Sequence, residues 1–118
     1  MVRPLDVVVS LMPEPVDLIG KVKGYAGLVV EVTGTKDGER RLVKVWFTMS
    51  HERAFEICHT NATGYIVGTG GAVGAEMFIS GQIKEKGMLF PEQLPASEYV
   101  SRLAEKHLEV KEDVTTLQ

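Results

Sequence analysis

One stretch, residues 60–78 (TNATGYIVGTGGAVGAEMF), limits most strongly what this chain can fold into. It begins with hydroxyl and amide side chains and continues as a nearly uncharged run of small and apolar residues. At 3.6 residues per turn, one face of a helix collects Ile66, Gly70, Val73 and Met77. Roughly the opposite face collects only the smallest residues, Gly64, Gly68, Gly71 and Ala75. The sequence therefore predicts a helix with a bare face that another backbone, or a ligand, can approach closely.

Such a helix needs support from its surroundings, because each of the five glycines between positions 64 and 74 costs roughly 1 kcal/mol relative to alanine. We expect packing on both sides, at the centre of the fold or at an interface. Thr60, Asn61 and Thr63 are candidates for the N-cap, since their side-chain oxygens can accept hydrogen bonds from the first free amides. The same amides also attract anions. Two interpretations stay open here, a well-capped buried helix and a helix start that faces a ligand.

Residues 68–74 also match a loose G-x-G-x-x-x-G pattern, which invites a dinucleotide-binding interpretation. That motif belongs between the first strand and the first helix of a βαβ unit, with an acidic residue about 20 positions later. The nearest acid at that distance, Glu92, lies between two prolines, and the chain after Gly74 is too short for the rest of a doubly wound domain. We therefore interpret these glycines as packing residues.

Composition indicates a single domain over residues 1–118, with 44% hydrophobic and 25% charged residues. The net charge of −3 argues against nucleic acid or an anionic membrane as the main partner. The one cysteine, Cys58, excludes an internal disulfide and fits a reducing compartment. The sequence has neither a signal peptide nor an apolar run of membrane-spanning length. We expect a cytoplasmic domain.

A β-hairpin is the clearest local prediction. Residues 28–33 and 40–49 alternate as strands, and residues 34–39 form the loop between them. Gly34 and Gly38 are expected to supply positive φ, with the tight turn at Asp37-Gly38. Both faces of the hairpin are partly apolar. The expected fold class is α+β in two layers, a mixed or antiparallel sheet covered by helices on one face, with the other face available for dimerisation.

The remaining elements follow from local signals. Residues 5–12 contain three consecutive valines and are expected to form a strand, and residues 16–22 a short helix or an irregular crossing. Ser50 is expected to cap a helix over residues 51–59, and Gly81 to end the glycine-rich helix. Pro95 suits the first position of a last helix, followed by a final edge strand. The expected inner stripe of that last helix is Tyr99, Val100, Leu103 and His107, and its solvated residues are Glu98, Arg102, Glu105 and Lys106.

No self-sufficient catalytic or metal-binding constellation is visible. His51 and His59 are eight positions apart, so they do not lie on one helix turn as two metal ligands would. The one cysteine does not complete a metal-ligand set with them. We expect solvated or capping histidines. Cys58 and His59 are adjacent and point to different sides of a helix, so they do not form a nucleophile–base pair, and Cys58 is expected to be a small buried residue.

Three features of the second half resemble the C-terminal part of the saccharopine dehydrogenase-like oxidoreductases. The first is the opening at Thr60 and Thr63-Gly64-Tyr65 with the small residues that follow it. The second is the helix exit over residues 81–88 (GQIKEKGM), and the third is Pro91-Glu92 followed by the last helix and residues 108–110 (LEV). The hairpin also looks like the second-domain sheet of this family. The resemblance covers roughly residues 25–112.

The resemblance implies a division of labour. In such enzymes an N-terminal Rossmann domain binds NAD or NADP, and a second domain supplies the substrate pocket and the dimer sheet. Carried over to this sequence, it implies substrate-binding residues at Thr60, Asn61, Thr63, Gly64 and Tyr65. The sequence departs from the family at Asn61-Ala62, where members often have a basic residue and another threonine.

We therefore expect the substrate-binding and dimerising domain of an NAD(P)-dependent, saccharopine dehydrogenase-like oxidoreductase of amino-acid (lysine) metabolism. Its expected partners are the missing Rossmann domain and a second copy of the chain. The chain holds no cofactor of its own in this interpretation, and by itself it should not catalyse hydride transfer. The alternative is a stand-alone, non-enzymatic dimeric module that binds a small anionic metabolite at the start of the glycine-rich helix.

Overall fold

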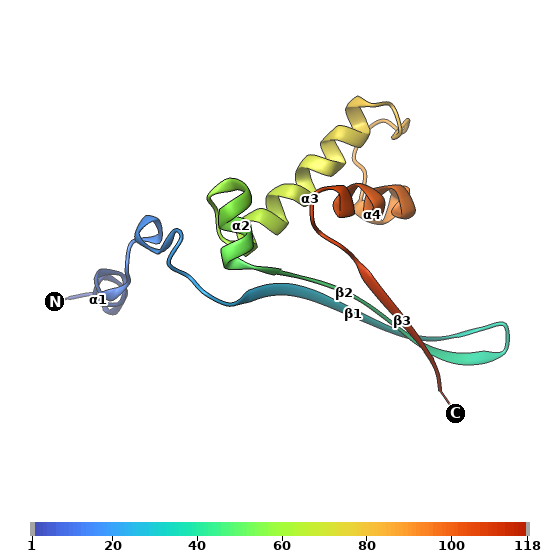
Figure 1. Ribbon diagram of the computed structural model, residues 1–118, viewed down its shortest axis with the longest axis horizontal. Helices are drawn as coiled ribbons and strands as arrows, with labels where there is room; N and C mark the ends of the chain where they lie inside the picture. Colours follow the sequence, from blue (N-terminus) through green and yellow to red (C-terminus); the bar gives the residue numbers. More distant parts are fainter. Residues whose placement is uncertain (1, 118) are drawn as a thin grey trace.

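Three antiparallel strands in the order β1-β2-β3 carry a group of helices at one end (Figure 1). The computed structural model describes residues 2–117. In chain order the elements are α1 (Pro4–Leu11), a 3-10 turn (Pro15–Leu18), β1 (Tyr25–Lys36), β2 (Glu39–Ser50), α2 (His51–Cys58), α3 (Ala62–Ile79), a second 3-10 turn (Pro91–Gln93), α4 (Ala96–Glu105) and β3 (Lys111–Thr116). The expected α+β fold with an antiparallel sheet is confirmed.

The β1–β2 hairpin is confirmed and is longer than expected. Its twelve-residue strands pair from Tyr25 with Ser50 to Lys36 with Glu39. Asp37 and Gly38, with φ of 56° and 81°, form the two-residue turn, whose positive φ values match the right-handed twist of the strands. Gly34 does not have the expected positive φ, because the chain is still extended there and pairs with Arg41.

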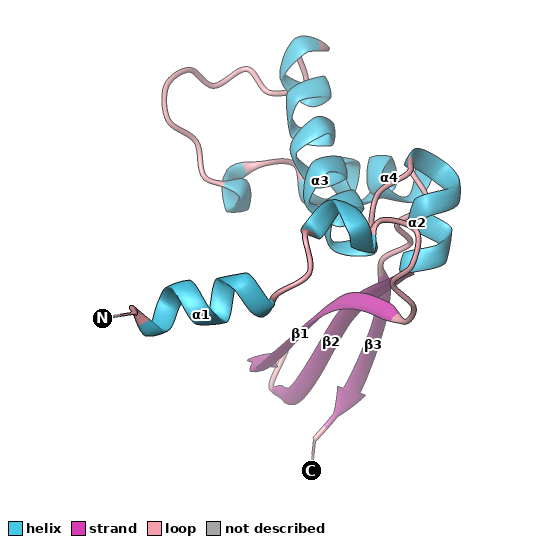
Figure 2. Ribbon diagram, turned by 90° about the vertical axis from the view of Figure 1, so that its left-hand side faces the viewer, coloured by secondary structure: helices cyan, strands magenta, loops and turns pink. Residues whose placement is uncertain are grey.

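The strand register sorts the sheet residues into two faces. One face carries the cross-strand pairs of Leu28 with Phe47, Val30 with Val45, and Val32 with Val43, the last continuing to Val114 on β3. The helices pack on this face, but only at the end of the strands where Met49 is buried. Figure 2 shows α2, α3 and α4 gathered beyond one end of the strands, and Figure 1 shows the hairpin extending away from them. The outer half of the sheet is therefore uncovered.

The core lies among α2, α3, α4 and the helix-proximal end of the sheet. Its buried apolar members are Met49, Ala54, Ala62, Tyr65, Val73, Met77, Ile83, Leu103 and Leu108. The expected cap of α2 is confirmed, because Ser50 accepts a hydrogen bond from the Arg53 amide. The expected end of α3 is also confirmed, since the helix ends just before Gly81. No helix within residues 2–117 is long and apolar enough to cross a bilayer.

The N-terminal segment is a helix, α1, so the expected strand over residues 5–12 is wrong. Pro4 stands at the start of this helix with a preset φ, and Arg3 pairs with Asp6 across the first turn at 3.1 Å. These local effects outweigh the β preference of the valine run, which has no neighbouring strand to pair with. None of the residues of α1 is buried, and Figure 2 shows the helix extending away from the rest of the chain.

The last helix begins one residue later than expected, because Pro95 is its N-cap and Ala96 its first residue. Leu103 is buried as expected, whereas His107 lies beyond the end of α4 with φ of 62° and is exposed. The inner stripe therefore does not extend to His107. The expected final edge strand is confirmed as β3, which pairs with β2 from Lys111 to Thr116.

Candidate functional site

The start of α3 is held by side chains of this chain. Asn61 is the N-cap, and its Oδ1 accepts a hydrogen bond from the Gly64 amide at 2.8 Å. His51 Nδ1, from the first turn of α2, accepts a hydrogen bond from the Ala62 amide at 3.1 Å. The expectation of an N-cap among the residues before the helix is confirmed for Asn61, and that of a capping histidine for His51. Two of the amides that could attract an anion therefore already have acceptors.

The buried stripe of α3 differs from the one expected. It consists of Ala62, Tyr65, Thr69, Val73 and Met77. Ile66 and Gly70, two of the four residues expected on this face, are only half-buried. The shift follows from Tyr65, whose phenol points inward and donates a hydrogen bond to the Lys106 carbonyl at 2.8 Å. This bond ties the first turn of α3 to the end of α4.

A groove of about 220 Å³ lies beside the first half of α3. Its lining residues are Cys58, Thr60, Gly64, Tyr65, Gly68, Thr69, Ala72 and Lys106. The structure thus brings together Thr60, Gly64 and Tyr65 from the expected substrate-binding set. Asn61 acts as the cap, and Thr63 is exposed and does not line the groove.

Five lining residues of the groove lie outside the expected substrate-binding set, and two of them, Cys58 and Lys106, differ from their expected surroundings. Cys58 is exposed rather than buried, because it is the last residue of α2 and turns toward the groove. Lys106 was expected to be solvated, but it is half-buried and its Nζ contacts Glu76 on α3 at 2.8 Å. No local pattern in the sequence predicts the contact between Lys106 and Glu76, since these residues are 30 positions apart.

Gly64 has a reason to be glycine within this chain. A Cβ there would lie 2.8 Å from the Thr60 Oγ1, so the hydroxyl occupies the space a side chain would need. The Thr60 hydroxyl therefore lies against the backbone of α3, and Thr60 is one of the residues that line the groove.

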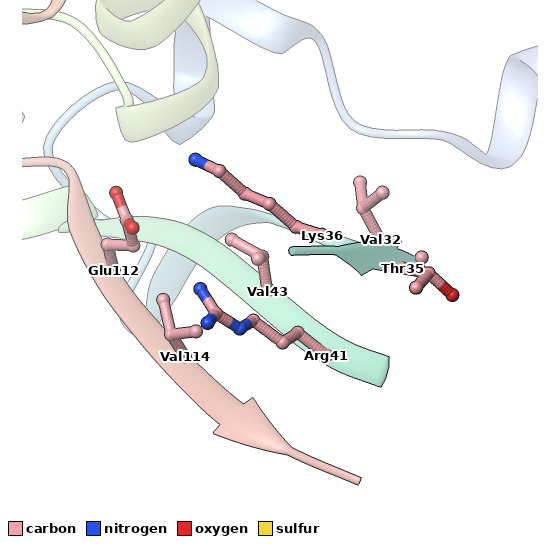
Figure 3. Close-up of a pocket in the computed structure, with 8 residues that line it drawn as sticks. Val32, Thr35, Lys36, Arg41, Val43, Glu112 and Val114 are labelled. Atoms are coloured by element: carbon pink, nitrogen blue, oxygen red, sulfur yellow. The ribbon is translucent and has the colours of Figure 1, made fainter. Parts of the chain in front are cut away.

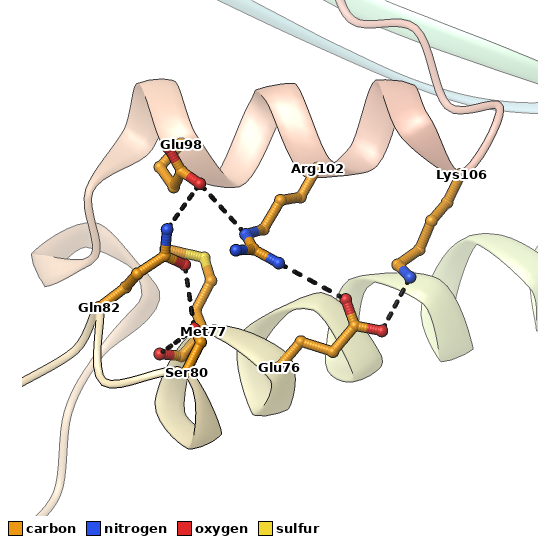
Figure 4. Close-up of polar contacts among 7 residues, drawn as sticks. All are labelled: Glu76, Met77, Ser80, Gln82, Glu98, Arg102 and Lys106. Atoms are coloured by element: carbon orange, nitrogen blue, oxygen red, sulfur yellow. Dashed lines mark hydrogen bonds and ion pairs between the residues drawn. The ribbon is translucent and has the colours of Figure 1, made fainter.

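Charged side chains link α3 to α4 beside the groove (Figure 4). Glu76 contacts both Lys106 and Arg102, the latter at 3.8 Å, and Arg102 continues to Glu98 at 3.2 Å. Glu98 also accepts a hydrogen bond from Gln82 at 2.7 Å. Arg102 and Lys106 are more buried than expected for solvated residues. Because the pairs remain partly exposed, they orient the two helices more than they stabilise them.

A second hollow, of about 250 Å³, lies on the outer half of the sheet (Figure 3). Val32, Val43 and Val114 form its apolar part, and Lys36, Arg41 and Glu112 stand around it, with Gly34 and Thr35 completing the lining. The hollow is on the helix-bearing face, beyond the end of the helices. On the opposite face Glu31 pairs with Lys44 at 3.3 Å, so that face is more polar.

Neither hollow contains a recognisable metal or dinucleotide site. Within the part of the chain that the structure describes, no three His, Cys, Asp or Glu residues lie close enough together to hold a metal ion. Residues 68–74 lie in the middle of α3 rather than in a strand-to-helix turn. Their amides are therefore engaged in the helix and do not form a phosphate cradle.

No known family model matches the chain, but three curated proteins do. The chain is 32% identical over 106 residues to the carboxynorspermidine synthase of Vibrio alginolyticus, covering 87% of this chain and 25% of that protein. It is 25% identical over 105 residues to the carboxyaminopropylagmatine dehydrogenase of Synechocystis sp., covering 89% of this chain and 26% of that protein. It is 32% identical over 94 residues to the carboxynorspermidine synthase of Vibrio cholerae, covering 80% of this chain and 23% of that protein. The chain thus spans about a quarter of the length of these relatives, and none of their names refers to saccharopine or lysine.

Proposed function

We propose that this chain is the substrate-binding and dimerisation part of an NAD(P)-dependent oxidoreductase, and that it works with a cofactor-binding Rossmann domain outside these residues. The observation that carries the proposal is the match of at least 80% of the chain to about a quarter of relatives named as a synthase and a dehydrogenase. A cytoplasmic location belongs to the same proposal.

The substrate class follows from what these names have in common. Carboxynorspermidine and carboxyaminopropylagmatine are polyamine derivatives that carry a carboxylate, and saccharopine likewise combines a carboxylate with a secondary amine. Two-electron reduction of a C=N bond produces such a secondary amine. We propose a substrate in which a secondary amine joins a carboxylate-bearing chain to an amine-bearing chain. Within this class we propose polyamine-related amino acids ahead of the lysine metabolism expected from the sequence, because the relatives' names refer to polyamine derivatives.

The groove beside α3 supplies the proposed substrate contacts. Thr60 offers its hydroxyl, Gly64 lets that hydroxyl lie against the backbone of α3, and the ring of Tyr65 forms part of the wall. Asn61 and Thr63 belong to the same proposed set, Asn61 by fixing the helix start and Thr63 as an exposed hydroxyl beside it. No catalytic residue is assigned to this chain, and the chain alone is not expected to turn over substrate.

Dimerisation through the sheet is the other part of the proposal. The outer half of the sheet exposes Val30, Val32 and Val114 by 48–58% of their surface, which favours a covered state. The opposite face, expected from the sequence to be available for dimerisation, is a second candidate for the same contact.

Calorimetry on the complete polypeptide and on the 118-residue chain tests the function. We expect NAD or NADP to bind the complete polypeptide and to give no heat with the 118-residue chain. We expect carboxynorspermidine or saccharopine to bind the complete polypeptide, with the affinity reduced about fivefold by Thr60→Val, since one hydrogen bond to a ligand is worth about 1 kcal/mol. Ser97→Val, on the exposed surface of α4, is the matched control. Tight binding of NAD or NADP by the 118-residue chain would contradict the proposal.

The alternative, a stand-alone module that holds an anionic metabolite at the start of α3, receives less support from the geometry. The Ala62 and Gly64 amides are already bound by His51 and Asn61. Binding of a small carboxylate to the 118-residue chain in the same calorimetry would favour this alternative.

A further inference from the structure

The turn between α2 and α3 holds Thr60 between two fixed points. It consists of residues 59–61, which lie between the two helices. At its start, His59 has a left-handed φ of 57°, and its amide donates a hydrogen bond to the Phe55 carbonyl at 2.8 Å, which closes the end of α2. At its end, Asn61 caps α3. Thr60 is therefore the middle residue of a short turn, and each of its neighbours is tied to a helix.

His51 reaches this turn from the first position of α2. Its Nδ1 accepts the hydrogen bond of the Ala62 amide across eleven positions of sequence. Its own amide donates a hydrogen bond to the Gly24 carbonyl, just before β1, at 2.9 Å. A ring nitrogen that accepts a hydrogen bond carries no hydrogen, so the neutral ring carries its hydrogen on Nε2. His51 thus connects the start of the sheet, the start of α2 and the start of α3.

The Ala62 amide depends on His51 for its acceptor. Ala62 is fully buried, so its amide has no access to water in the intact structure. Asn61 does not take this role, because its Oδ1 already accepts the hydrogen bond of the Gly64 amide. A buried amide without an acceptor is costly. Removal of the His51 ring therefore disturbs the backbone at the point where the turn enters α3.

We propose that His51 is a positioning residue of the groove beside α3, and that it holds Thr60 in place through the Ala62 amide. The Thr60 Oγ1 lies 2.8 Å from the position that a Cβ at Gly64 would occupy, so the hydroxyl lies against the helix only while the turn keeps its shape. Loss of the His51 acceptor releases the end of the turn that is nearest to this contact. The consequence for the substrate rests on the proposed function, in which the Thr60 hydroxyl binds the substrate.

The threonine methyl signals of the complete polypeptide test the positioning without a ligand. Threonine methyl groups are labelled with carbon-13, and the Thr60 signal is assigned by its absence from Thr60→Val. We expect His51→Ala to move this signal and to speed hydrogen exchange of the Ala62 amide about fivefold, because one hydrogen bond is lost.

Two further variants make this test specific to the acceptor. His51→Asn should restore both readouts, because the asparagine Oδ1 is attached to Cγ as Nδ1 is in histidine. Glu52→Ala removes the next side chain of α2, which is exposed, and should change neither readout. An unmoved Thr60 signal in His51→Ala would overturn the proposal. A signal that moves equally in His51→Ala and His51→Asn would also overturn it, because the acceptor would then not matter.

A double-mutant cycle on substrate binding tests whether His51 acts through Thr60. Calorimetry measures the affinity of the complete polypeptide for carboxynorspermidine. We expect His51→Ala to reduce this affinity by up to about fivefold, the effect expected of Thr60→Val, and to cause no further loss in the Thr60→Val background. A general structural contribution of His51 would reduce the affinity equally in both backgrounds, and that result would overturn the proposal.

The two experiments separate this inference from the proposed function. If neither carboxynorspermidine nor saccharopine binds while the Thr60 signal moves as expected, the substrate assignment is lost and His51 keeps its role in holding Thr60. If Thr60→Val weakens substrate binding but His51→Ala leaves the Thr60 signal in place, the proposed function stands and the role of His51 is lost.

Discussion

At the residue scale, glycine serves two different purposes in α3. At Gly64 the missing side chain makes room for the Thr60 hydroxyl of the same chain. At Gly68 and Gly71 the missing side chain leaves an open surface. Glycine is therefore required by a local contact at position 64, whereas no contact within the described residues requires it at positions 68 and 71.

This difference predicts different responses to alanine at the two positions in the 118-residue chain. Gly68→Ala should raise the free energy of unfolding by roughly 0.5–1 kcal/mol, because alanine favours the helix and meets no atom. Gly64→Ala should raise the free energy of unfolding by less than Gly68→Ala does, or lower it, because the added Cβ would meet Thr60 Oγ1. Urea unfolding measures both.

A double-mutant cycle gives the control. Thr60→Ala removes the obstructing hydroxyl, so adding Gly64→Ala in that background should recover the gain seen at Gly68. Equal effects of alanine at the two positions, with no coupling to Thr60, would contradict the role assigned to Gly64.

At the element scale, α3 and α4 are joined by two kinds of contact. Tyrosine hydroxyls reach across to backbone carbonyls, Tyr65 to Lys106 and Tyr99 to Gly70, at 2.8 and 3.0 Å. Glu76, Arg102 and Lys106 add ion pairs at the surface. Because the first kind is more buried, it should contribute more to stability than the second.

Two substitutions separate these contributions. Tyr65→Phe should lower the free energy of unfolding by about 1 kcal/mol, independent of salt, because a partly buried carbonyl loses its donor. Lys106→Met keeps the aliphatic stem and should change it by less than about 1 kcal/mol, an effect that shrinks further in high salt. Thermal unfolding at low and high salt measures both. A larger, salt-sensitive loss for Lys106→Met than for Tyr65→Phe would reverse this ranking.

At the scale of the whole molecule, the fold leaves large apolar surfaces open. The radius of gyration is 19.2 Å, whereas a compact domain of this length has about 13–14 Å. The open surfaces are α1, the outward face of α3 and the outer half of the sheet. Such a shape is typical of one part of a larger assembly, since each surface needs a partner to leave water.

The sheet surface carries a prediction about oligomeric state. Val32→Lys combined with Val114→Lys places two charges on the helix-bearing face and should convert a dimer into a monomer, because burying unpaired charges is costly. Val29→Lys places a charge on the opposite face and is the comparison. Sedimentation equilibrium of the complete polypeptide measures the outcome. Dissociation by Val29→Lys alone would assign the dimer to the opposite face, and a dimer that survives all three lysines would exclude the sheet.

Local chemistry explains what could be predicted in advance. The hairpin follows from alternating apolar residues and the Asp37-Gly38 turn, and the caps at Ser50 and Asn61 follow from short side chains before helices. These signals act within a few residues, so no tertiary structure is needed to read them. The face of α3 that carries only small residues could also be predicted from the sequence, because it depends only on helix periodicity.

The α+β class, the hairpin, the starts of α2 and α3 and the small-residue face of α3 could be predicted from the sequence, because they arise from contacts near in sequence. Long-range packing sets three other features: Tyr65 points inward to Lys106, Cys58 is exposed, and the sheet is covered at one end only. The reason is that these features depend on segments up to about forty positions apart, whose approach is set by packing. The expected strand over residues 5–12 was wrong for the same reason, since a valine run becomes a strand only where another strand lies beside it.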